Sequence, residues 1–148
     1  MNYELLNLVV EFIEENLTNE INYKKLSKKV GINDFILQRV FNIMCGLSIS
    51  EYARKRRLSC AYEELKLTNN KIIDVAFKYR YESSVSFARS FKKEFGITPK
   101  QVRKNDNSFK TFPRYEFNIF IWSLTLKSSV SPGWVNRLQQ YTIFASLL

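Results

Sequence analysis

The feature that most constrains the fold of this chain is an internal repeat within residues 1–104. Residues of matching physical type recur fifty positions apart, at Leu37 and Phe87, Arg39 and Arg89, Phe41 and Phe91, Gly46 and Gly96, and Ser48 and Thr98. Further upstream the offset is 49, and it pairs Leu26 with Val75, Val30 with Tyr79 and Gly31 with Arg80. A repeat of this length predicts two copies of one supersecondary unit, with one extra residue in the second turn.

Each copy carries the signals of two short helices separated by a tight turn. The first copy predicts helices over 23–30 and 34–45, each preceded by an asparagine cap and followed by a glycine. The second copy predicts helices over 71–79 and 84–95, capped by Asn70 and Ser83. Two short helices joined in this way are typical of a helix-turn-helix unit.

A long helix is expected to connect the two units. Ser48 and Glu51 have the spacing of a capping box, and the helix is expected to continue to about Leu67. At ~1.5 Å per residue, about 19 residues give a connector near 28 Å, which is commensurate with the ~34 Å between successive major grooves on one DNA face. With an amphipathic helix over 3–17 and a short helix after Thr98, an all-α domain is predicted, and one monomer is expected to present two recognition helices.

The net charge of +9 is distributed unevenly along the chain. Residues 1–22 hold five Glu and no Lys or Arg, whereas residues 23–104 hold 19 Lys or Arg against 7 Asp or Glu. A basic segment of this strength favours a polyanionic partner, and nucleic acid is preferred to anionic lipid because no basic segment is a membrane-surface amphipath. Charge that serves solubility alone does not predict this asymmetry.

Metal, thiol and enzyme chemistry are not expected. The chain has no histidine, and its two cysteines, Cys45 and Cys60, are interpreted as small core residues or free thiols. There is no glycine-rich phosphate loop and no paired carboxylates on a plausible cleft, so we expect neither a cofactor nor an enzyme. The N-terminal residues lack a signal peptide, and the longest mostly apolar run, 117–126, is too short to span a bilayer. A cytosolic protein without a membrane partner is therefore predicted.

These motifs resemble a known family. Leu-Gln-Arg-Val-Phe at 37–41 and Phe-x-Arg-x-Phe-Lys-Lys at 87–93, followed by Phe-Gly-Ile-Thr-Pro at 95–99, are similar to the DNA-binding domain of the AraC/XylS family of bacterial transcriptional regulators. The resemblance covers residues 3–104. It implies a seven-helix, bipartite fold in which two helix-turn-helix units are joined by a long helix. It also implies binding to double-stranded promoter DNA, usually by an activator that contacts RNA polymerase.

The resemblance assigns DNA contacts by position. The base-contacting residues would be Phe35, Gln38 and Arg39 in the first unit, and Ser84, Val85, Ser86, Ala88 and Arg89 in the second. The phosphate-contacting residues would be Asn42, Arg54, Lys55, Arg57, Arg80, Lys92 and Lys93. Each arginine of a recognition helix can pair with guanine or hold a phosphate, a glutamine can read adenine, and Val85 and Ala88 offer apolar contact to thymine methyl groups. For any single basic residue, a solvated surface charge is the competing interpretation.

One departure from the family pattern concerns the second turn. The family usually has glycine where this chain has Arg80, between Tyr79 and Tyr81. If the position requires a positive φ, an arginine costs roughly 1 kcal/mol there. Val102, where the family often has tyrosine, is a milder loss of packing. The second unit is therefore expected to fold with less stability than the first.

Residues 105–148 differ in composition from the rest of the chain, and no family resemblance covers them. We expect a linker at 105–108, a strand at 115–126, a turn at 128–133 and a helix at 134–148. Three alternatives stay open for this appendage: it packs on the helical domain, it forms a dimer contact, or it is the stub of a lost or truncated effector-binding domain. A stub or a poorly packed appendage is favoured. Two rival functions follow, a dimerisation or antagonist module and a ligand sensor, although nothing in this chain supports a small-molecule effector directly.

Overall fold

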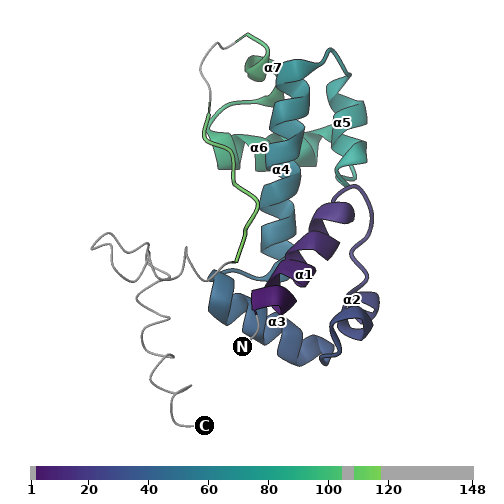
Figure 1. The fold of residues 1–148 in the computed structure, drawn as a ribbon. Helices are drawn as coiled ribbons and strands as arrows, with labels where there is room; N and C mark the ends of the chain where they lie inside the picture. The colour runs from purple at the N-terminus through teal and green to yellow at the C-terminus, as the bar shows by residue number, and fades with distance from the viewer. Residues whose placement is uncertain (1–2, 105–108, 118–148) are drawn as a thin grey trace, which may run out of the picture. The chain divides into compact units, whose positions relative to one another are not determined.

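The computed structural model describes residues 3–104 and 109–117, and the regular structure in these residues is entirely helical (Figure 1). Its seven helices are α1 (Tyr3–Glu15), α2 (Tyr23–Val30), α3 (Asp34–Cys45), α4 (Ile49–Leu67), α5 (Ile72–Lys78), α6 (Ser84–Phe95) and α7 (Pro99–Val102). The all-α, seven-helix fold expected from the sequence is confirmed. None of these helices is long and apolar enough to cross a membrane.

The chain forms two compact units. Among the described residues, the first unit holds 3–12, 22–51 and 115–117, and the second holds 13–21, 52–104 and 109–114. The long helix α4 begins in the first unit and continues into the second. Each unit contains one of the two predicted helix pairs, α2 with α3 and α5 with α6.

The helix pair of the first unit begins and ends where its local signals place it. The side chain of Asn22 accepts a hydrogen bond from the Lys25 N–H at 2.9 Å, and that of Asn33 accepts one from the Phe35 N–H at 2.9 Å. Gly31 and Gly46 end the two helices in the left-handed conformation, with φ of 70° and 72°. These caps satisfy backbone groups that a helix leaves unpaired at its ends, so the boundaries follow from single residues.

Two predicted helix boundaries are wrong. The cap of α5 is Lys71 rather than Asn70, because the Asn70 amide instead donates to Glu64 Oε1 at 3.0 Å. The first helix ends at Glu15 rather than at residue 17, because the Asn16 N–H bonds the Ile13 carbonyl in a tighter turn. By contrast, Ser83 caps α6 as predicted, accepting from the Ser86 N–H at 3.1 Å.

The core of the second unit is built on the aromatic stripe of α6. Phe87 and Phe91 are fully buried, and Phe95 is nearly so. Tyr62 of α4 lies against Phe91 and Phe95, with ring centroids 6.3 and 5.1 Å away. Val75 and Ala76 of α5 belong to the same buried cluster. Figure 1 shows α5, α6 and α7 grouped around the C-terminal part of α4. Burial of this stripe therefore sets which face of α6 remains outside.

The turn between α5 and α6 has the backbone that the repeat predicts. Arg80 has φ of 69°, and it is the only non-glycine residue with positive φ among the described residues. The Tyr81 N–H bonds the Ala76 carbonyl at 3.0 Å, just as the Ile32 N–H bonds the Ser27 carbonyl at 3.2 Å in the first unit. Arg80 and Gly31 therefore occupy equivalent positions, and the expected left-handed strain at Arg80 is present.

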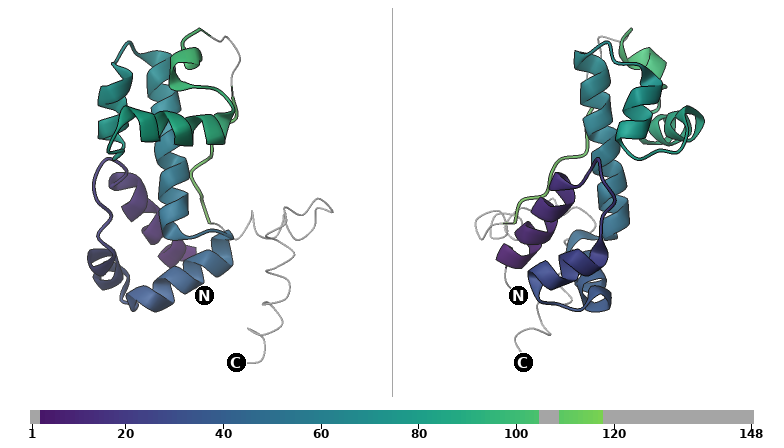
Figure 2. Two further views of the ribbon diagram at one scale, coloured as in Figure 1. Left: turned by 180° about the vertical axis from the view of Figure 1, so that it is seen from behind. Right: turned by 90° about the vertical axis from the view of Figure 1, so that its right-hand side faces the viewer.

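An extended segment, residues 109–114, packs along α4 in the second unit, and we call it the strap (Figure 2). The Phe109 N–H donates to the Tyr62 hydroxyl at 3.1 Å, and the Phe112 N–H donates to Ser59 Oγ at 2.8 Å. Arg56 Nη1 donates to the Phe112 carbonyl at 2.6 Å. The side chains that hold the strap recur at helical spacing and form one stripe of α4.

Several predictions for the appendage lie outside the described residues. These are the linker at 105–108, the turn at 128–133, the helix at 134–148 and most of the strand at 115–126. Residues 115–117 of that strand are described, and they have no regular structure. The backbone of Phe117 pairs with Asn7 of α1 in the first unit, donating to Asn7 Oδ1 at 2.8 Å and accepting from Asn7 Nδ2 at 2.7 Å.

Candidate nucleic-acid interface

The outer face of α3 carries the predicted base-contacting residues of the first unit. Phe35, Gln38 and Arg39 are exposed, and Phe35 leaves 72% of its surface accessible. Asn42, one helical turn further on, is also exposed. Leu37 and Phe41 point the other way and are fully buried. An exposed phenylalanine beside an amide and a guanidinium offers both apolar and hydrogen-bonding contact to base edges.

The corresponding face of α6 carries the predicted residues of the second unit. Val85 is 66% exposed, Ser86 and Arg89 are exposed, and Ser84 and Ala88 are partly buried. The Ser86 hydroxyl takes part in the helix cap, because it donates to the Ser83 carbonyl at 2.9 Å. Apart from Arg89, the side chains of this face are shorter than those of α3, so the two units differ in the contacts they can make.

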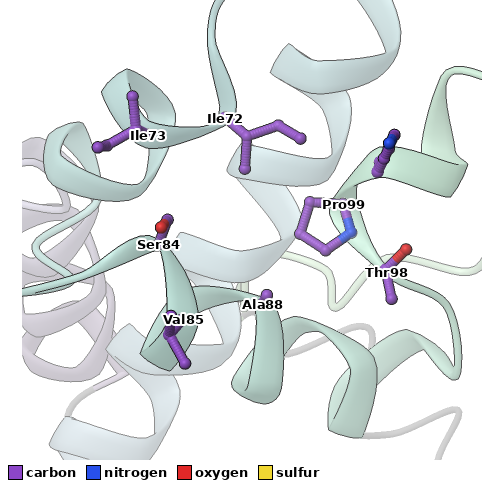
Figure 3. Close-up of a pocket in the computed structure, with 8 residues that line it drawn as sticks. Ile72, Ile73, Ser84, Val85, Ala88, Thr98 and Pro99 are labelled. Atoms are coloured by element: carbon purple, nitrogen blue, oxygen red, sulfur yellow. The ribbon is translucent and has the colours of Figure 1, made fainter.

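An open groove of about 540 Å³ adjoins this face of α6 (Figure 3). It is lined by residues of three helices and the turn before α7, namely Ile72, Ile73, Ser84, Val85, Ala88, Thr98, Pro99 and Lys100. Three of the predicted base-contacting residues therefore share an apolar depression with α5 and α7. This groove could not be predicted from the sequence, because its walls come from segments that are up to 28 residues apart in the chain.

The basic run at the start of α4 is largely engaged within the second unit. Lys55 Nζ lies 2.7 Å from Glu94 Oε1, and Arg54 Nη1 lies 3.5 Å from Glu94 Oε2. Arg57 donates to the carbonyls of Leu17 and Asn19 at 2.7 and 2.9 Å. These contacts connect α4 with α6 and with the segment that follows α1. The predicted phosphate contacts of Arg54, Lys55 and Arg57 stay predictions, and each of these side chains already has an intramolecular partner.

Arg56, in the same run, forms an enclosed ion pair in the second unit. Its guanidinium donates to both oxygens of Glu14, from Nε at 2.7 Å and from Nη2 at 3.0 Å, and the two side chains are 14% and 13% exposed. Burial by itself opposes the charged form of Arg56, but the hydrogen bonds to Glu14 outweigh it and raise the pKa of the guanidinium. Arg56 therefore holds two other segments against α4, because it pairs with Glu14 of α1 through two bonds and donates a third to the strap.

The remaining predicted phosphate-contacting residues lie on the surface. Arg80, Lys92 and Lys93 are exposed, the last two in the final turn of α6. Cationic side chains at a helix C-terminus also complement the helix dipole, so exposure alone does not assign them to DNA.

Metal and thiol chemistry have no support in the described part of the chain. No group of three or more His, Cys, Asp or Glu side chains is placed to hold a metal ion there. Cys45 and Cys60 are free thiols, and burial raises the pKa of the Cys45 thiol to about 12. The Cys45 thiol therefore stays protonated at neutral pH, which agrees with its place in the core.

Comparison with known proteins places the chain in a family. A profile described as a helix-turn-helix domain matches residues 26–105. The HTH-type transcriptional activator AarP of Providencia stuartii is 37% identical over 105 residues, which are 71% of this chain and 78% of AarP. The regulatory protein SoxS of Salmonella typhimurium is 34% identical over 100 residues, which are 68% of this chain and 94% of SoxS.

One relative matches beyond the helix-turn-helix region. YkgA of Escherichia coli, named as an HTH-type transcriptional regulator, is 34% identical over 139 residues, which are 94% of this chain and 51% of YkgA. A match of that length within 148 residues necessarily continues past residue 105. The appendage is therefore part of the similarity to YkgA.

Solved structures agree with the fold. An AraC-type transcriptional regulator from Chromobacterium violaceum superposes with a TM-score of 0.64 at 25% identity, covering 68% of this chain and 90% of that one. The DNA-binding domain of AdpA, solved with a target DNA, has a TM-score of 0.59 at 19% identity, which supports the fold alone; the match covers 68% of this chain and 89% of AdpA's. AarP is named as a transcriptional activator and SoxS as a regulatory protein, in agreement with the expectation that the chain is not an enzyme. The chain therefore belongs to the AraC/XylS family of helix-turn-helix, DNA-binding transcriptional regulators.

Proposed function

We propose that this regulator is an activator whose monomer reads two adjacent major-groove segments of promoter DNA, with α3 in one segment and α6 in the other. The observation that carries the proposal is the repeated exposed face. Two N-capped helices follow turns that begin with the same backbone hydrogen bond, and each helix buries one apolar stripe and leaves the opposite side exposed. A recognition helix that enters the groove with its N-terminal half exposes these positions.

Base recognition is assigned to the two exposed faces. In the first unit it falls to Phe35, Gln38 and Arg39, and in the second to Ser84, Val85, Ser86, Ala88 and Arg89. The apolar groove beside α6 supports contact with thymine methyl groups rather than with polar base edges. Because the two faces differ in chemistry, we expect two unlike half-sites and therefore an asymmetric operator.

Phosphate contact is assigned first to Asn42, Arg80, Lys92 and Lys93, which are exposed. Arg54, Lys55 and Arg57 contribute only if DNA draws them from their present partners. The activator role rests on the similarity to AarP, which is named as an activator, and it implies contact with RNA polymerase. We assign residues 1–104 to the DNA-binding domain and 105–148 to an appendage that YkgA shares.

The test is selection of bound DNA from a random pool with the full chain, followed by titration of the selected duplex. We expect a site about two helical turns long with two unlike half-sites and one monomer per duplex. A single short half-site would contradict reading by both units, and a dimer on a palindrome would contradict reading by a monomer.

Point variants then separate the two kinds of contact. Arg39→Ala should relax base preference at one position, whereas Lys92→Ala should weaken binding to all sequences and reduce the salt slope by about 0.9. Transcription from the selected site with purified RNA polymerase tests activation, and repression or no change would contradict that part of the proposal.

A further inference from the structure

A hydrogen bond within α3 joins an acidic side chain to one of the proposed base-reading side chains. Gln38 Nε2 donates to Asp34 Oδ1 at 2.9 Å, one helical turn away. Asp34 is the first residue of α3, next to the cap Asn33, and Gln38 is exposed on the face that we assign to DNA. The side chain that reads a base is therefore held by a neighbour that has no such assignment.

The chemistry of this pair determines which way the Gln38 amide faces. A carboxylate has only acceptor oxygens, whereas an amide has a donor end and an acceptor end. Only the NH₂ group of Gln38 can bond Asp34, so the carbonyl Oε1 must lie on the other side. One of the two Nε2 hydrogens stays available beside that carbonyl. The amide thus presents one donor and one acceptor in a defined order.

A donor beside an acceptor matches adenine in the major groove. Adenine offers the N7 acceptor and the N6 donor, and a glutamine bonds both at once, whereas guanine offers two acceptors, N7 and O6. We propose that Asp34 is a positioning residue that holds the Gln38 amide in one orientation and so sets a preference for adenine at the base that Gln38 reads. This inference rests on the proposed function, because it requires α3 to lie in the major groove.

The internal repeat shows that the helix does not need this pair in order to form. At the offset of fifty residues, Asp34 and Gln38 correspond to Ser84 and Ala88 of α6, which cannot form such a bond. Even so, α6 has the same length as α3, 12 residues, and the same kind of polar N-cap. The pair is therefore an addition to the motif at the proposed reading surface of the first unit.

Asp34 also has a structural role that must be kept apart from positioning. An acidic side chain in the first turn interacts favourably with the helix dipole, and its loss lowers stability without changing base preference. Its negative charge also opposes all DNA equally. Asp74 is the matched control, because it is an exposed acidic residue in the first turn of α5. Asp74→Ala removes the same charge but leaves α3 intact.

The test measures base preference with the full chain and duplexes that carry each of the four bases at the position affected by Gln38→Ala. We expect adenine at that position for the unaltered protein and a loss of about fivefold or more in preference for Gln38→Ala. Asp34→Ala should lower the preference about twofold, the value of such a side-chain pair. Asp34→Asn should do the same, because an amide accepts and donates and so permits both orientations, whereas Asp34→Glu should retain the preference.

The controls make the outcome decisive. Asp74→Ala should strengthen binding to all four duplexes and leave the preference unchanged. In a Gln38→Ala background, Asp34→Ala should cause no further change in base preference. If Asp34→Ala keeps the full preference while Gln38→Ala removes it, the positioning role is overturned and α3 is still a reading helix. If Gln38→Ala alters no position, or that position prefers another base, the inference fails while selection of a bipartite site still supports the proposed function.

Discussion

Arg80→Gly is predicted to stabilise the protein, which is unusual for a substitution that removes a large side chain. Arg80 has φ of 69°, and the backbone cannot leave this region without losing the hydrogen bonds from the N–H groups of Arg80 and Tyr81, each 3.0 Å long. Relief of the left-handed conformation is worth about 1–2 kcal/mol. Glycine costs about 0.5–1 kcal/mol more than other residues in lost backbone freedom. The centres of these two ranges differ by about 0.75 kcal/mol, so the net gain expected in the free energy of unfolding is about 0.5–1 kcal/mol.

Thermal unfolding followed by circular dichroism, without DNA, measures this gain as a rise in Tm of about 1–4 °C. Two control variants isolate the backbone term. Arg80→Ala removes the charge but keeps a Cβ, so it should leave Tm nearly unchanged. Gly31→Ala places a Cβ at φ of 70°, where nothing lies within 4 Å, so the expected loss of about 1 kcal/mol is purely conformational.

The reasoning would be refuted by an unchanged or lower Tm for Arg80→Gly in the same series in which Gly31→Ala is destabilised. That result would mean that the two turns are not equivalent, although their hydrogen bonds match. DNA binding is measured separately, because Arg80 is also assigned to phosphate contact, and its loss is expected to weaken binding even as stability rises.

Three further predictions concern the second unit. Arg56→Ala should lower the free energy of unfolding by about 3–5 kcal/mol, because it removes the cationic partner of the enclosed Glu14 carboxylate, which keeps the hydrogen bond from the neutral Tyr52 hydroxyl; urea unfolding checks this, and a loss below 1 kcal/mol would contradict it. Burial alone would raise the pKa of Glu64, but hydrogen bonds from Lys78, Asn70 and Tyr79 lower it, so the ionised carboxylate stabilises the fold at neutral pH and this stability is lost as pH falls through the carboxyl range. The free energy of unfolding should therefore depend less steeply on pH in this acid range for Glu64→Gln, and an unchanged slope would oppose this. Ser59→Ala should free the Phe112 N–H from α4 and speed hydrogen exchange at that amide, with Ser50→Ala as an exposed control; unaltered exchange would argue against the strap.

The ends of most helices could be predicted because each depends on one or two neighbouring residues. Asn22, Asn33 and Ser83 cap their helices where the sequence places them, and Gly31 and Gly46 end theirs in the left-handed conformation. Asn70 was assigned wrongly for an equally local reason. It is a good cap by type, but Glu64, six residues earlier, takes its amide, and a cap propensity contains no information about that partner.

The candidate interface was predictable in part. Alternation of buried and exposed positions on α3 and α6 follows from the spacing of Leu37, Phe41, Phe87 and Phe91, so the outer faces could be named in advance. The partners of the basic run in α4 could not be predicted from the sequence. Glu94 lies about 40 residues from Arg54 and Lys55, and four adjacent cations look alike in sequence until the fold brings a carboxylate to some of them.

The sequence by itself determined the repeat, the helical class and the basic middle of the chain, because all of these depend on residue type and spacing along one chain. The left-handed strain at Arg80 was a conditional expectation, and the φ of 69° in the structure established it. The tertiary structure decided what those residues meet. In the structure Arg56 pairs with Glu14, residues 109–114 pack along α4, a groove lies beside α6, and Gln38 donates to Asp34. Even the bond between Gln38 and Asp34, which are four residues apart, could not be predicted from the sequence, because helical spacing permits a side-chain hydrogen bond without requiring that it form.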